Sequence, residues 1–373
     1  MRTAISFSLL LSLFATVASF ASNATGLGSP SGADGRYTSS TCLSSTSPIF
    51  ADGFESGDSS NWTAQVPCRS DGGACLEQVG SIDFPSETGR VVISGAYAYT
   101  TGYDFLRVVD ISDPTYPIES GSLEGMYGNF EVAGKYLYAT HHDPADWGFR
   151  VVDISNSASP VEIGSLFFGE FPMGIALSGN HVFVPTHLKG LRVIDVANPT
   201  HPVQVGELDV VGLLSYITTS GNYSYAWHNG GSQGIGLRVI DISDPTTPVP
   251  LGLVELGDDP KGLEVSGDYA YVLRDLRDLT VVDVSNPLNP YEVASIDTGD
   301  YPEGLTLSSN FAFVAVTHEG IVVIDLSDPT NPKKVGSQGE ALHGSRDVAV
   351  SACHAYVPIW LEGLRVIDVS CYQ

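Results

Sequence analysis

The sequence predicts an all-β fold, a seven-bladed β-propeller of four-stranded antiparallel blades, from three observations. A phrase of the type Leu-Arg-Val-Ile-Asp-Ile-Ser-Asp-Pro recurs along the chain, and its last copy is truncated. A second phrase, VSGDYAYV at residues 265–272, recurs with the same period. The aspartates of the first phrase lie 42 to 46 residues apart, a period typical of repeat folds. They are Asp110, Asp153, Asp195, Asp241, Asp283, Asp325 and Asp368.

Each repeat is predicted to contain four short strands, named A to D. In the fifth repeat these strands are expected at residues 262–266, 269–273, 279–284 and 291–296. A two-residue Gly-Asp turn joins A to B, and an Asp/Asn-Pro-x-x-Pro signal between C and D prevents strand continuation. Strand C is apolar on both faces in most copies, which favours sheets stacked around a ring. The repeated aspartates are expected to accept hydrogen bonds from turn N–H groups rather than to catalyse.

The recurring phrase also resembles the LVIVD family of exported or surface propellers of bacteria and archaea. The resemblance extends from about Cys75 to the C-terminus and is intact or nearly so in six copies. It implies the propeller fold and an outer-surface or secreted location. The family has no common reaction, so the resemblance implies no catalytic residues.

The ring is expected to close with a strand from the other end of the chain. The last repeat ends at Gln373 after strand C, whereas residues 75–82 align with D strands such as residues 160–166. An N-terminal D strand would therefore complete the last blade.

Five cysteines in an exported chain favour two disulfides and one remaining thiol, for which Cys42 is the candidate. Placing the N-terminal strand in the last blade would bring Cys75 beside Cys371 and leave Cys68 to pair with Cys353. The alternative, in which Cys68 pairs with Cys75 and Cys353 with Cys371, stays open.

Three regions are predicted along the chain. Residues 1–21 have the charged start, apolar stretch and small residues of a signal peptide, which predicts a secreted, periplasmic or cell-surface protein. Residues 22–74 form a Ser/Gly-rich leader or linker, in which acids at 52–58 could hold calcium, although a solvated linker is favoured. Residues 75–373 form the propeller. No later stretch approaches eighteen apolar residues, so no membrane span is predicted.

The net charge restricts the partners. The chain has 43 acidic and 17 basic residues, a formal net charge of -26. Nucleic acid is excluded because binding phosphate depends on Lys and Arg. A glycan, a peptide or another protein is the expected partner of a monomeric chain.

One rim of the ring is the predicted binding surface. In a four-stranded blade the B–C and D–A links share one rim, called here the B–C rim, and the A–B and C–D links share the other, the C–D rim. Aromatic planes beside carboxylates suit a sugar ring or a peptide, and the alternative is that these residues cap the ends of the blades. The candidates on the B–C rim are Trp147, Trp227, Trp360, Tyr103, His141, His187, His228, His318 and His343.

Two further sites are considered. His187, His228 and His318 could hold a divalent metal ion in a hydrolase or lyase, but they lie on different blades and solvent-facing histidines without a cofactor are favoured. Lys261, Glu303 and Arg346 occupy equivalent positions at the start of strand A, near the channel. They are predicted to form ion pairs there, with a substrate clamp as the alternative.

The sequence favours a binding or interaction module that uses its B–C rim. No nucleophile elbow, P-loop, HExxH, CxxC or dinucleotide fingerprint is present, so catalytic residues are unknown and enzymatic activity is left open.

Overall fold

The computed structural model describes residues 76–102, 104–257, 259–339, 342 and 344–372. The chain divides into the units Met1–Ser40 and Thr41–Gln373, and all described residues belong to the second. The predicted signal peptide and leader lie outside the described residues, as do Cys42, Cys68, Cys75, Tyr103 and His343. Within the described part of the chain, no helix is long and apolar enough to cross a bilayer.

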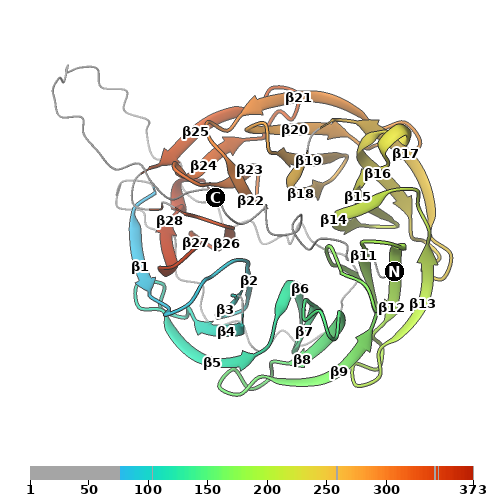
Figure 1. Ribbon diagram of the computed structural model, residues 1–373. Coiled ribbons are helices and arrows are strands. Elements are labelled where there is room, and N and C mark those ends of the chain that lie inside the picture. Colours follow the sequence, from blue (N-terminus) through green and yellow to red (C-terminus); the bar gives the residue numbers. More distant parts are fainter. Residues whose placement is uncertain (1–75, 103, 258, 340–341, 343, 373) are drawn as a thin grey trace, which may run out of the picture. The chain divides into compact units, whose positions relative to one another are not determined.

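Seven antiparallel four-stranded sheets are arranged in a ring as the blades of a propeller, and we call the centre of this ring the channel (Figure 1). The A strands lie nearest the centre and the D strands form the outer circumference (Figure 1). The A strands are β2 (Val91–Ser94), β6 (Tyr127–Ala133), β10 (Ala176–Ser178), β14 (Leu213–Ser220), β18 (Pro260–Ser266), β22 (Pro302–Ser308) and β26 (Ala349–Ser351). The D strands of blades one to six are β5 (Ile118–Glu124), β9 (Val161–Phe167), β13 (Val203–Leu208), β17 (Val249–Glu255), β21 (Tyr291–Asp297) and β25 (Lys333–Gln338).

The two middle strands of each blade are the most deeply buried. The B strands are β3 (Tyr97–Thr101), β7 (Tyr136–His141), β11 (His181–Thr186), β15 (Tyr223–Asn229), β19 (Tyr269–Arg274), β23 (Phe311–Val316) and β27 (His354–Ile359). The C strands are β4 (Phe105–Asp110), β8 (Gly148–Asp153), β12 (Gly190–Asp195), β16 (Ile235–Asp241), β20 (Asp278–Asp283), β24 (Gly320–Asp325) and β28 (Gly363–Asp368). Two short 3-10 turns, η1 (Gly231–Gln233) and η3 (Ser370–Tyr372), complete the described elements.

These strands confirm the predicted fold, and in the fifth blade the observed boundaries differ from the predicted ones by two residues at most. The ring closes as predicted. β1 (Gln78–Ile82) pairs antiparallel with β28, so the last sheet has the order β1-β28-β27-β26. Cys353 and Cys371 each take part in a disulfide bond. Cys68 and Cys75, their predicted partners, lie outside the described residues, so which cysteines pair stays a prediction.

The hydrophobic core consists of layers between neighbouring blades. Between blades one and two, for example, Leu106 and Val108 of β4 pack in one cluster with Phe130 of β6 and Leu137 of β7. Because every blade presents apolar side chains on both faces, no blade can bury them without its neighbours. This explains why strand C is apolar on both faces.

The repeated aspartates hold the C–D turns. In every blade the carboxylate that ends strand C accepts a hydrogen bond from the backbone N–H two residues later, at 2.8–2.9 Å. The prediction that these groups are turn acceptors is confirmed.

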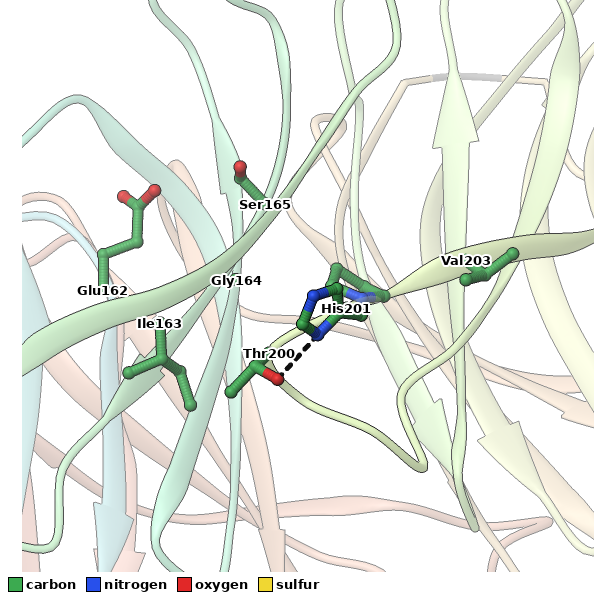
Figure 2. A pocket seen from close by; sticks show the side chains of 8 residues that line it. Glu162, Ile163, Gly164, Ser165, Thr200, His201 and Val203 are labelled. Atoms are coloured by element: carbon green, nitrogen blue, oxygen red, sulfur yellow. Dashed lines mark hydrogen bonds between the residues drawn. The ribbon is translucent and has the colours of Figure 1, made fainter.

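A glycine in strand D lets the next blade approach closely. A Cβ atom on Gly164 of β9 would lie 2.2 Å from the Pro199 carbonyl oxygen in the C–D link of the next blade. Gly206 has the same relation to Pro245. A shallow groove of about 520 Å³ runs along this contact, where Thr200 and His201 are hydrogen-bonded (Figure 2). Since the contact recurs around the ring, we interpret the groove as a product of blade packing.

Candidate functional site

The structure separates the predicted rim residues into exposed and buried groups. His187 and His318 are exposed, and His141, Trp147 and Trp360 are half-buried. The prediction that Trp227 and His228 present a surface is wrong, because they are only 2% and 1% exposed. Blade four has the longest spacing between repeated aspartates, 46 residues. Its β15 extends to Asn229, which places both side chains inside the strand rather than in the B–C link.

The rings of the two half-buried tryptophans contact other side chains of the chain. The Arg346 guanidinium lies 3.9 Å from the centre of the Trp360 ring, a cation–π contact. Trp147 makes an edge contact with Phe171 at 6.1 Å between ring centres. A broad open aromatic platform for a sugar is therefore not formed by these residues.

The histidines do not gather around a common point. His228 Nε2 donates to the Val211 carbonyl at 2.9 Å, and its Nδ1 faces Arg238 at 3.4 Å. His318 contacts Asp300 at the B–C rim. Across the described ranges, no group of three or more His, Cys, Asp or Glu side chains could hold a metal ion. His187, His228 and His318, the alternative metal site considered from the sequence, are thus not among such a group.

Exposed leucines mark the tips of B–C links in alternate blades. Leu188, Leu276 and Leu361 are 75%, 65% and 65% exposed, in blades three, five and seven. Val211 and Tyr301 add exposed apolar surface from D–A links on the same rim. These leucines were not predicted, because the predicted binding surface was chosen from aromatic residues and histidines alone. The sequence feature that could have revealed them is a leucine inside a short polar link, as in His-Leu-Lys-Gly and Trp-Leu-Glu-Gly.

A buried ion pair fixes the link that carries Leu188. Glu170, in the link before β10, is 4% exposed and bonds the guanidinium of Arg192 on β12. Its other carboxylate oxygen accepts the backbone N–H of Leu188 at 3.1 Å. The leucine is therefore presented by a rigid link rather than a loose one.

Arg277, the residue after Leu276, contacts an aromatic and an acidic side chain. Arg277 lies 4.5 Å from the centre of the Tyr301 ring and 3.8 Å from Asp300. Asp300 also contacts His318 of the next blade. These contacts connect the rim of blades five and six into one surface.

The predicted channel residues pair in part with one another. Arg346 lies 3.5 Å from Glu303, which also accepts a 3.5 Å hydrogen bond from the Thr317 hydroxyl. Lys261 instead approaches Asp275, in the B–C link of its own blade, at 3.6 Å. The equivalent positions therefore form two separate ion pairs near the channel entrance.

A second set of charges lies at the A strands and was not found from the sequence. We call Arg90, Glu131, Glu264 and Asp347 the channel cluster. Burial raises the pKa of Glu131 to about 7 and that of Glu264 to about 8, and for Glu264 the charge of Glu131 adds to the effect. Burial also raises the pKa of Asp347, against the opposing attraction of Arg90.

Seven four-stranded blades and a repeated strand-ending aspartate define a repeat-built β-propeller. The chain belongs to the LVIVD repeat family. The LVIVD repeat matches residues 86–125, 124–167, 172–210, 214–255, 258–298, 301–338 and 344–371. A comparison with curated proteins finds no match.

Solved structures share the fold at low sequence identity. The β-propeller domain of Cps50 (Swd1) from Myceliophteria thermophila has a TM-score of 0.63 at 13% identity, covering 79% of this chain and 99% of that one. A functionally unknown protein from Desulfotomaculum acetoxidans DSM 771 gives 0.59 at 15% identity, covering 71% and 91%. The computationally designed protein Ika8 gives 0.59 at 11% identity, covering 79% and 99%. At these identities the likeness extends to the fold alone.

Proposed function

We propose that this chain is an exported binding module that holds a peptide segment of a protein partner on its B–C rim. The predicted signal peptide supports export, and the propeller with LVIVD repeats is consistent with an interaction module. The observation that carries the choice of rim is the set of exposed leucines at the tips of B–C links. Apolar side chains held out on fixed links are the surface type that buries against a partner.

The two rims differ in what their links repeat. In blades one to six the C–D links share one turn, which the same aspartate hydrogen bond holds, so their sequence serves the structure of the ring. The B–C links differ from blade to blade, from the link of blade four, which has three glycines and contains η1, to the short Leu-containing links. A surface that recognises one partner needs such unequal links, whereas a structural turn does not.

The choice of a peptide over a glycan follows from the aromatic residues. Trp227 is internal, and Trp360 already has Arg346 against its ring. Leucine side chains offer no flat face for a sugar but fit the apolar anchors of a peptide.

The proposal is tested with a random peptide library displayed on phage and selected on the mature chain. We expect selected peptides to bind Leu276→Asp and Leu361→Asp about tenfold more weakly or worse, because a buried contact gains an uncompensated charge. Leu288→Asp is the matched control, since Leu288 is 70% exposed on the C–D rim. Equal loss with the control would refute the proposal. So would a glycan array that returns ligands when the peptide selection returns none.

A further inference from the structure

The channel cluster joins blades that are not neighbours. Glu131 lies on β6 of blade two and Glu264 on β18 of blade five, and blades three and four separate them around the ring (Figure 1). The charge of Glu131 nevertheless acts on Glu264, and Arg90 and Asp347 act on both carboxyl groups. These groups therefore interact electrostatically across the centre of the ring.

The two glutamates occupy equivalent places in their blades. Glu131 pairs in register with Tyr138, and Glu264 pairs with Tyr271. The residues at this position in the other blades carry no charge. They are Val92, Ala176, Thr218, Thr306 and Ala349.

The guanidinium of Arg90 attracts all three carboxyl groups of this cluster electrostatically. Arg90 donates from Nη1 to Asn129 Oδ1 at 2.9 Å, and its Nε is buried without a hydrogen-bond partner among the described residues. Asp347 accepts the Val91 N–H at 3.0 Å. With all three carboxyl groups ionised, these half-buried side chains would hold excess negative charge close together, which is costly.

Among the described residues, Arg90 is the cation that lowers the pKa of Glu131, Glu264 and Asp347. The Tyr216 hydroxyl, on β14, interacts with Arg90 and with three carboxyl groups. Blade three presents Gly174 and Ala176 on this part of β10 and the residues before it, so it adds no charge. The carboxyl groups near Tyr216 are Glu303, Asp259 and Asp347.

We propose that the channel cluster makes the stability of the closed ring depend on pH. Protonated Glu131 and Glu264 stabilise the ring, whereas their ionised forms repel each other and destabilise the arrangement of blades two and five. Protonation of two of the three carboxyl groups removes the negative charge that Arg90 alone cannot balance. Glu131 ionises first, and its charge then opposes ionisation of Glu264.

The direction of the effect follows from proton linkage. The pKa values of about 7 and about 8 lie above 4.5, the ordinary glutamate value, so the folded chain holds protons that the unfolded chain has released. Stability therefore falls as pH rises from about 4.5 through about 8. Burial lowers the pKa of His142 to about 4, and this group acts oppositely, adding stability as pH rises from about 4 to 6.5. Above pH 6.5 the carboxyl effect is no longer offset by this histidine.

The test is urea unfolding of the mature chain at pH 6.5 and pH 9, with and without Glu264→Gln. We expect the unfolding constant of the wild-type chain to rise by about a hundredfold between these pH values, with about thirtyfold of that rise from Glu264 and about fourfold from Glu131. In Glu264→Gln, a nearly isosteric neutral variant, most of that rise should disappear. Glu292→Gln is the matched control, because Glu292 is exposed on β21 of the same blade. Equal pH dependence in all three proteins would overturn the proposal.

A direct readout covers the case in which Glu264→Gln does not fold. The wild-type chain at pH 6.5 should show the infrared carbonyl band of a protonated carboxylic acid, which fades by pH 9. A spectrum containing only carboxylate bands at pH 6.5 would contradict the proposal regardless of how the variant behaves.

Discussion

Trp227→Ala is expected to lower the free energy of unfolding by about 3–5 kcal/mol, the cost of removing a large buried aromatic side chain. Trp227 on β15 is 2% exposed and packs with Leu237, Val239 and Leu256 between blades four and five. Urea unfolding monitored by circular dichroism measures the loss. Weak partner binding by this variant would then report damaged packing rather than a lost contact.

Trp360→Ala is the control for this prediction. Trp360 is half-buried at the B–C rim, with Arg346 against its ring, so its replacement should destabilise the chain by less than half as much. Equal losses in the two variants would contradict the assignment of Trp227 to the core and Trp360 to the rim.

Glu170→Ala is expected to cost about 3–5 kcal/mol, because it leaves the buried Arg192 guanidinium without its carboxylate partner. The pair lies at 4% and 11% side-chain exposure, and Glu170 also holds the Leu188 N–H. The same variant should increase amide hydrogen exchange at the Leu188 link. Urea unfolding and exchange mass spectrometry measure the two effects.

Asp83→Ala provides the matched comparison. Arg365 occupies the same place in Gly-Leu-Arg-Val-Ile-Asp of β28 as Arg192 does in β12. Its partner Asp83 is 80% exposed, so solvent screens the pair and the loss should stay below about 1 kcal/mol. If Asp83→Ala destabilises as much as Glu170→Ala, burial is not what makes the Glu170 pair strong.

The fold could be predicted because each repeat reports on the same structure independently. The aspartate at the end of strand C and the Pro-x-x-Pro signal after it recur in register, so errors at one copy are corrected by the others. The strand exchange followed from the missing D strand after β28 and an unmatched D-like segment at residues 75–82.

The site was harder to predict because it lies where the repeats differ. Whether Trp227 belongs to a strand or a link depends on how far β15 extends. The fourth repeat is longer than the others, but its sequence does not show which element contains the additional residues. Glu131 and Glu264 could have been found by aligning the A strands, where each replaces an uncharged residue. That Glu131 acts on Glu264 across the ring depends on ring geometry rather than on any local pattern.

The proposed function depends most directly on the B–C rim being the binding surface. Hydrogen–deuterium exchange of the mature chain, with and without a peptide selected from the phage library, tests this without any substitution. We predict slower exchange in the B–C links at residues 187–189, 275–277 and 360–362, and unchanged exchange in C–D links such as residues 284–290. Protection confined to the C–D links or to the outer D strands would contradict the account.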